Sequence, residues 1–171
     1  MTPRAQLREG QKMRATMNAR SETIGQLVSF ARHWKAGQLC LIPADAFFEP
    51  RYDDTGKSTR WRIGLADGEP FAIAGLWRTW SNGATSFTMP TVNADRHPFL
   101  QQFHKPGDEK RSVVILPPET WDDWLACRDP ERARTFLRLL PPERLAGVPA
   151  PVPPRKRASA LDGVQATLSA G

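Results

Sequence analysis

Short apolar runs separated by polar turns dominate the middle of the chain, a pattern typical of β-strands rather than of long helices. Residues 39–49 predict two buried strands with a bend at Pro43, and residues 61–65 alternate as a half-buried strand does. Further strands are predicted at residues 71–80, 85–92 and 112–116. Asp67-Gly68 and Asn82-Gly83 are hairpin signals between successive strands of this series.

Three other stretches are predicted to be helical. Ser21 is a candidate N-cap for the first, Pro118 opens the second, and Asp129-Pro130 starts the third. The apolar residues of these helices are Ile24, Leu27, Val28 and Ala31, then Trp121, Trp124 and Leu125, then the stretch ending at Leu139 or Leu140. We therefore expect an α+β fold, in which several antiparallel strands form a curved, barrel-like sheet with a few helices outside it.

The 171 residues suit one domain with tails. We expect a basic arm at residues 1–17, a domain at residues 18–140, and a tail rich in proline and alanine at residues 141–171. Within that tail, residues 146–171 are expected to be disordered. The hydrophobic content of 40% and charged content of 25% are those of a soluble globular protein.

No apolar run approaches the length of a membrane span, and the N-terminus lacks a signal-peptide core. The two cysteines, Cys40 and Cys127, give neither a disulfide framework nor metal-ligand spacing. We therefore expect a cytoplasmic monomer in a reducing compartment, with no cofactor and no metal ion.

The charge favours a polyanionic partner. There are 24 Lys and Arg residues against 18 Asp and Glu, a net charge of +6. Residues 1–20 carry five cations against the single acid Glu9, which gives 5 − 1 = +4. Those cations are Arg4, Arg8, Lys12, Arg14 and Arg20. Nucleic acid is the first partner to test, although a GC-rich genome would also enrich arginine.

Glu49 ends the apolar run at residues 39–49, and a carboxylate at such a position tends to have a raised pKa that suits general acid/base work. Taken alone, the run favours the plainer interpretation of a strand end facing water. His97 and His104 lie in a long polar connection at residues 93–110, whereas His33 has a structural position beside Trp34. Phosphate-binding glycine loops, metal clusters and nucleophile elbows are absent from the sequence.

Six short blocks in a fixed order identify a family. They are NARSET at 18–23, CLIPADAFFE at 40–49, FAIAGLW at 71–77, SFT at 86–88, FHKPGDEKR at 103–111 and VVILP at 113–117. This series resembles the SRAP family, the SOS response-associated peptidases or abasic-site-processing proteins, over roughly residues 15–126.

The resemblance implies binding of single-stranded DNA at an abasic site and a covalent link to the ring-opened sugar aldehyde. In the family a cysteine directly after the initiator methionine is the nucleophile, and its thiol and α-amine close a thiazolidine on the aldehyde. The resemblance also implies peptidase-type self-processing and a DNA lyase. By this likeness Asn18 positions the N-terminal residue, Glu49 shuttles protons, His104 assists acid/base steps, and Arg20 and Arg111 contact DNA phosphates.

The chain departs from the family pattern at its start, which is Met1-Thr2-Pro3 without the cysteine. The family's opening portion, with its tryptophan-containing stretch, also has no counterpart, so we expect a fold incomplete at the N-terminus. Cys40 lies in an apolar strand, where a thiol is inert, and Cys127 is the better candidate nucleophile. Thr2 lacks the context of an N-terminal nucleophile.

A second departure lies between His104 and Arg111, where six residues stand in place of the family's one. The segment Lys105–Glu109 therefore resembles an insertion, which separates Arg111 from His104 in the sequence.

Three hypotheses remain open. The first is an SRAP-type abasic-site processing protein. The second is a truncated or catalytically inactive module that binds single-stranded DNA, and the third is plain arginine-mediated DNA binding. Whether the chain is an enzyme depends on a nucleophile, and we expect that it does not crosslink abasic DNA.

Overall fold

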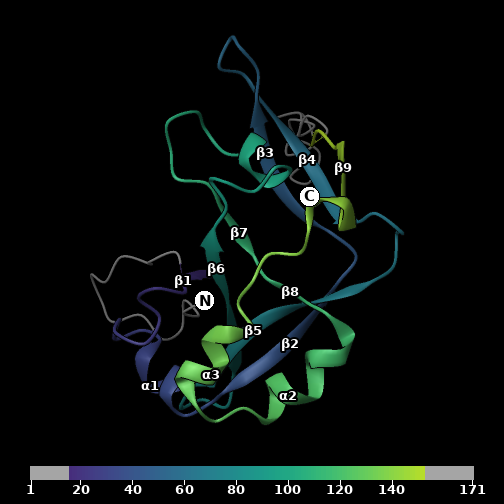
Figure 1. The fold of residues 1–171 in the computed structure, drawn as a ribbon. Helices are drawn as coiled ribbons and strands as arrows, with labels where there is room; N and C mark the ends of the chain where they lie inside the picture. The colour runs from purple at the N-terminus through teal and green to yellow at the C-terminus, as the bar shows by residue number, and fades with distance from the viewer. Residues whose placement is uncertain (1–15, 153–171) are drawn as a thin grey trace, which may run out of the picture.

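The computed structural model describes residues 16–152, and Figure 1 shows two β-sheets with three short helices gathered at one end of the larger sheet. The larger sheet has the strand order β1-β6-β5-β2, with β7 paired to β6 and β8 paired to β5. Its strands are β1 (Asn18–Arg20), β2 (Leu39–Ala44), β5 (Phe71–Thr79), β6 (Thr85–Asn93), β7 (Arg111–Val113) and β8 (Ile115–Leu116). β1 runs parallel to β6, and the other pairs are antiparallel.

The smaller sheet has the order β3-β4-β9 and is antiparallel. Its strands are β3 (Phe47–Tyr52), β4 (Ser58–Leu65) and β9 (Leu145–Pro149). Within the described residues the sheets curve without closing into a barrel. The predicted α+β class with a curved, mainly antiparallel sheet is confirmed. No helix among residues 16–152 combines the length and apolar character that a membrane span requires.

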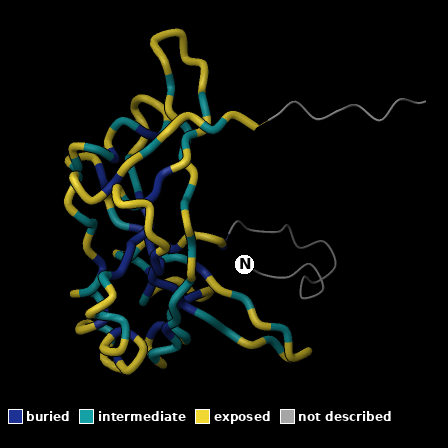
Figure 2. Tube along the Cα trace, turned by 90° about the vertical axis from the view of Figure 1, so that its right-hand side faces the viewer, coloured by how far each residue is buried: buried dark blue, intermediate teal, exposed yellow. Residues whose placement is uncertain are grey.

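Strand β5 lies between the two hydrophobic clusters of the core. Its residues Phe71 and Ile73 belong to one cluster and Ala74 and Leu76 to the other, as alternate side chains on opposite faces of a strand must. Six consecutive β5 residues are buried. Figure 2 shows the buried stretches running through the centre of the molecule, with exposed turns around them.

The predicted hairpin at Asp67-Gly68 is wrong in its pairing. The turn itself forms, since Gly68 has φ of 80° and its N–H donates to the Leu65 carbonyl at 3.1 Å. However, β4 pairs with β3 and β9, whereas β5 pairs with β2, β6 and β8. A turn dipeptide specifies a local reversal, and burial of β5 on both faces decides its neighbours. The hairpin at Asn82-Gly83 is confirmed, because β5 and β6 pair across it.

The predicted first helix is also wrong over most of its length. Turns occupy residues 21–30, and the helix α1 is confined to Ala31–Lys35. Val28 is 96% exposed, so it does not share a buried face with Ile24. Gly25 lowers the helix propensity of the stretch. The Arg134 guanidinium donates to the Ser21 carbonyl, which in a helix would accept a backbone hydrogen bond instead.

The remaining helices are shorter than predicted. α2 (Trp121–Ala126) follows a 3₁₀ turn, η3 (Pro118–Thr120), and α3 spans Pro130–Thr135. Asp129 is confirmed as the N-cap of α3, because its side chain accepts from the N–H groups of Glu131 and Arg132. The chain leaves the helix early because Leu137 packs in one core cluster and Leu139 and Leu140 in the other.

The predicted strand at residues 112–116 is divided. Val114 separates β7, which pairs with β6, from β8, which pairs with β5. Its carbonyl accepts from the Ala74 N–H at 2.8 Å, and its side chain is fully buried. One apolar run therefore forms two short strands, which pair with the neighbouring strands β6 and β5.

The expected disorder from residue 146 is wrong for the part that the structure describes. A 3₁₀ turn, η4 (Pro142–Arg144), leads into β9, which pairs with β4 at the edge of the smaller sheet. Leu145 is buried there, and an edge strand tolerates Pro149 because its outer N–H positions need no partner. Residues 153–171 lie outside the described part, as does the predicted basic arm apart from Thr16 and Met17.

Candidate functional site

A cleft of about 280 Å³ brings together all five of the predicted site residues. Strands from both sheets contribute to it, together with the connection that precedes β7. The lining residues are Asn18, Arg20, Glu49, Thr91, His104, Arg111, Ser112 and Val113. Residues that are far apart in the sequence, such as Asn18 and His104, therefore line the same cleft.

Strand β1 directs Asn18 and Arg20 to one side. Both are exposed while Ala19 between them is buried in the core, which is the alternation of a strand with one buried face. Parallel pairing with β6 sets Asn18 opposite Met89 and Arg20 opposite Thr91. The register of β1 thus fixes which of its side chains reach the cleft.

Glu49 and His104 form the closest acid/base pair of the cleft. The Glu49 Oε2 lies 3.5 Å from His104 Nε2, and the two side chains are 19% and 25% exposed. Burial raises the pKa of Glu49, and the charge of His104 opposes that rise. The plainer expectation of a strand-end carboxylate facing water is therefore wrong.

His104 is held by its backbone and its ring together. Its φ of 64° lies in the left-handed region, which is uncommon for a residue other than glycine. Its N–H donates to the Pro50 carbonyl at 2.7 Å, which ties it to β3 next to Glu49. Its Nε2 lies 2.6 Å from the Arg111 carbonyl, and because a carbonyl only accepts, that nitrogen carries a proton.

Arg111 is 13% exposed, and protein atoms surround its guanidinium. Its nitrogens donate to the Thr91 side chain at 3.2 Å and the Thr91 carbonyl at 2.6 Å. The same group pairs with Glu22 at 2.7 Å and with Glu109 at 2.5 Å. The guanidinium of Arg111 is therefore already bound to two carboxylates and a carbonyl. Arg20, by contrast, is 59% exposed and pairs with Glu109 at 2.7 Å.

Both carboxylates of this network favour their charged form. Hydrogen bonds from Asn93 and then from Arg111 lower the pKa of Glu109. Burial by itself would raise the pKa of Glu22, but its backbone N–H and Arg111 outweigh that effect and lower it. Sequence reasoning missed the roles of Glu22 and Glu109. An acid placed two residues before Arg111 in an inserted segment is the signal that could have found Glu109.

Comparison with known proteins decides the family. The family model described as "SOS response associated peptidase (SRAP)" matches residues 1–152. This chain belongs to the SRAP family. The match covers the whole described part and extends beyond both ends of the resemblance found from the six blocks.

The SRAP chain has curated relatives in Bacillus subtilis. It is 31% identical to the abasic site processing protein YoqW over 126 residues, which are 71% of this chain and 54% of YoqW. It is 33% identical to the abasic site processing protein YoaM over 111 residues, 64% of this chain and 46% of YoaM. The chain therefore spans about half the length of the curated relatives it matches.

Solved structures share the SRAP fold of this chain. A Bordetella bronchiseptica protein is 42% identical with a TM-score of 0.73, covering 79% of this chain and 65% of its own. A Bacteroides thetaiotaomicron protein has a TM-score of 0.62 at 22% identity, covering 77% and 57%, and supports the fold alone.

Neither thiol of the SRAP chain lies in the cleft. Cys40 is on β2, where burial raises its pKa to about 11. Cys127 is 4% exposed in a core cluster, and its Sγ donates to the Asp129 carbonyl at 3.3 Å. The expectation that Cys127 is the better candidate nucleophile is wrong, because a buried thiol is a poor nucleophile. Within residues 16–152, no group of three or more His, Cys, Asp or Glu is arranged to hold a metal ion.

The other two histidines have structural contacts. The N–H groups of Phe99 and Leu100 donate to His97 Nδ1, so its Nε2 must donate to the Leu140 carbonyl at 2.8 Å. His97 thereby ties the connection before β7 to the chain segment after α3. His33 Nδ1 lies 2.5 Å from Gln38 Oε1 at the end of α1.

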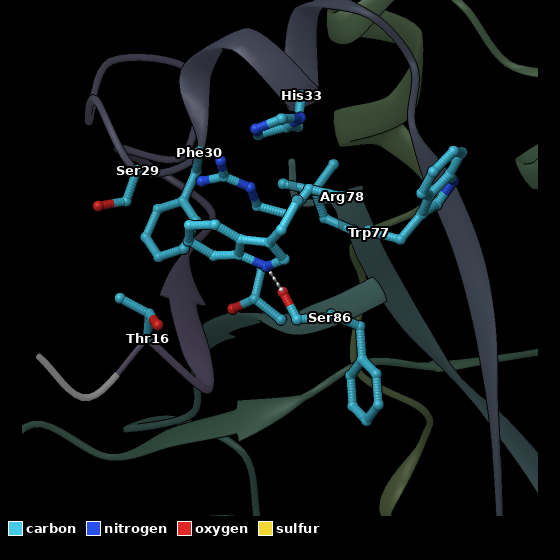
Figure 3. A pocket seen from close by; sticks show the side chains of 11 residues that line it. Thr16, Ser29, Phe30, His33, Trp77, Arg78 and Ser86 are labelled. Carbon is cyan, nitrogen blue, oxygen red and sulfur yellow. Dashed lines mark hydrogen bonds between the residues drawn. The ribbon is translucent and has the colours of Figure 1, made fainter. Parts of the chain in front are cut away.

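The two larger hollows outside the cleft contain none of the predicted site residues. Figure 3 shows a pocket beside α1. Its volume is about 50 Å³, and within its lining the Trp80 indole N–H donates to Ser86 Oγ at 2.8 Å. The Arg78 guanidinium stacks 3.5 Å from the centre of the Trp80 ring, so these two lining residues already make a cation–π contact with each other. A groove of about 410 Å³ along β8 and η3 is lined mainly by proline and apolar side chains. Neither brings a carboxylate and an imidazole together as the cleft does.

Proposed function

We propose that this SRAP chain binds single-stranded DNA with an abasic site in the cleft and processes the opened sugar by proton transfer. The observation that carries the proposal is the pair of Glu49 and His104, 3.5 Å apart and largely buried in a cleft that Asn18 and Arg20 also line. The curated relatives are named abasic site processing proteins, which supports the same substrate.

The proposed chemistry uses a carboxylate that can both accept and donate. In the ring-opened sugar the C1 aldehyde acidifies C2; removal of a C2 proton forms a double bond between C2 and C3, breaks the bond from C3 to its phosphate oxygen, and releases the 3′ part of the strand with that phosphate. Because the pKa of Glu49 is raised, its protonated form persists to higher pH than that of an exposed glutamate. In this proposal Glu49 accepts the C2 proton, His104 stabilises the charge that develops beside it, and Asn18 orients the sugar by hydrogen bonds.

The DNA backbone would lie along the Arg20 side of the cleft. Arg20 is 59% exposed, and a guanidinium grips phosphate with two hydrogen bonds without selecting a base. The guanidinium of Arg111, which is paired with Glu22 and Glu109, would contact the DNA backbone deeper in the cleft. A net charge of +6 favours association with any single strand.

A second candidate is a module that binds single-stranded DNA without processing it. The position of the two thiols favours it, because Cys40 and Cys127 both lie outside the cleft. In this case Glu49 and His104 would shape the site without transferring protons. The two candidates differ in conversion of the DNA and agree on its binding.

The experiment compares two labelled single strands that are identical except for one abasic site. We expect tighter binding of the abasic strand, and its conversion to a cleaved species on a denaturing gel. The control is a variant with Cys40→Ala and Cys127→Ala, which should convert the strand as well as the wild type does. Equal affinity for the two strands would contradict the proposal, and preferential binding without conversion would favour the second candidate.

A further inference from the structure

We propose that Glu109 competes with DNA phosphate for the cleft, because in the free protein its carboxylate bridges Arg20 and Arg111, the two predicted phosphate contacts. A DNA phosphate would then bind by replacing Glu109. This inference rests on the proposed function, since it concerns the same cleft. It adds a residue that lies in the inserted segment and outside the lining of the cleft.

The geometry of Glu109 is that of a bridging anion. Its Oε2 lies 2.7 Å from Arg20 Nη1, and its Oε1 lies 2.5 Å from Arg111 Nη1. Two oxygens of one phosphate can make the same pair of contacts, since guanidinium groups match both carboxylate and phosphate geometry. Among residues 16–152, Glu109 is the one carboxylate that forms an ion pair with Arg20.

The loop that carries Glu109 is anchored at both ends. His104 is fixed to Pro50 and Arg111 as described above, and the Lys110 N–H donates to Asp95 Oδ1 at 2.7 Å. Asn93 donates to Glu109 Oε1 at 3.2 Å. The Glu109 side chain is still 32% exposed, so it can leave the arginines by rotating without unfolding the loop.

The charges of the network explain why the position of Glu109 affects DNA binding. Arg20 and Arg111 contribute two positive charges, and Glu22 and Glu109 contribute two negative charges, so these four residues sum to zero. When a phosphate displaces Glu109, Arg111 keeps its ion pair with Glu22, and Arg20 turns wholly to the ligand. Binding therefore includes the cost of breaking the ion pairs of Glu109.

The decisive variant is Glu109→Gln, which removes the charge and retains an acceptor for Asn93. We expect it to bind a fluorescent single strand with one abasic site about fivefold more tightly than the wild type, the scale of an exposed ion pair. The matched control is Asp108→Asn, the same charge change on an exposed neighbour that makes no ion pair among the described residues. In an Arg20→Gln background, Glu109→Gln should lose most of its effect.

Fluorescence anisotropy at fixed low salt gives the affinities, and circular dichroism checks that each variant is folded. A gain confined to Glu109→Gln supports the inference. An equal gain in Asp108→Asn would overturn it by showing a plain net-charge effect, and so would unchanged or weaker binding by Glu109→Gln. If the folded wild type and all variants fail to bind, the proposed function itself is contradicted.

Discussion

Glu49 could be selected from the sequence because the apolar run before it ends in a single carboxylate. The family blocks likewise pointed to Asn18, Arg20, His104 and Arg111, and the structure brings all five residues into one cleft. The partners of the arginines could not be predicted in this way. Glu22 and Glu109 meet at Arg111 across 87 positions of sequence (109 − 22), a contact that depends on the fold and not on local pattern.

At this scale the pKa of Glu49 makes a prediction about stability. A carboxyl whose folded pKa is raised contributes stability that is fully present below its unfolded pKa and is lost as pH rises through the folded pKa. Glu49→Gln cannot titrate, so it should match the wild type near about pH 4 and be more stable at neutral pH. Urea unfolding across this range measures the difference.

The control for that series is Glu69→Gln, which changes an exposed carboxylate in the turn between β4 and β5. A change shared by both variants is an effect of removing one negative charge, and only the change specific to Glu49→Gln is assigned to the burial of Glu49. If Glu49→Gln became less stable relative to the wild type as pH rises, the raised pKa of Glu49 would be contradicted.

Among the elements, β9 shows where sequence pattern fails. Its Pro, Ala and Gly residues predict a disordered tail, yet it pairs with β4, a strand some 80 positions earlier (145 − 65), and buries Leu145. Composition describes what a segment can do alone, whereas an edge strand is stabilised by the sheet that receives it.

Leu145→Ala tests whether β9 contributes to the core. Leu145 is 8% exposed within a core cluster, so its truncation should lower the free energy of unfolding by about 2–4 kcal/mol. Val148→Ala on the same strand is the control, since Val148 is 56% exposed and should change stability by less than about 0.5 kcal/mol. Equal small effects in urea unfolding would mean that β9 is not docked.

Gly75 tests the packing between β2 and β5. A Cβ at this position would lie 2.6 Å from Cys40 Sγ and 2.8 Å from Ile42 Cδ1, both on the paired strand β2. Gly75→Ala should therefore destabilise the protein by about 1–3 kcal/mol in urea unfolding. Adding Cys40→Ala removes one of the two clashes and should restore part of the loss. A neutral Gly75→Ala would show that the sheet has room there.

At the scale of the whole molecule, the sequence predicted the class and most strands but not their division between two sheets. The turn at Asp67-Gly68 has the same character as the true hairpin turn at Asn82-Gly83, yet it carries the chain from one sheet to the other. The cleft lies where the two sheets meet, with Glu49 from the smaller sheet and Asn18 and Arg20 from the larger. That division is what creates the site.

The overall charge of +6 makes a further prediction about DNA binding. Affinity for a single strand should fall as salt rises, because Lys and Arg side chains that bind phosphates release the counterions of the DNA. Arg20→Gln should weaken binding and reduce the slope of log affinity against log salt by about 0.7, the value for one phosphate contact. Anisotropy titrations at several salt concentrations give the slope, and an unchanged slope would mean that Arg20 does not contact a phosphate.

The most direct test of proton transfer in the cleft is a single-turnover conversion of the abasic single strand, followed on a denaturing gel. Wild type and Glu49→Gln are compared at protein concentrations where both saturate the DNA. We predict equal binding and a conversion rate at least about 100-fold lower for Glu49→Gln, as loss of a general acid/base group requires. Equal conversion rates for the two proteins would contradict the assignment of Glu49 and, with it, the proposed use of the cleft.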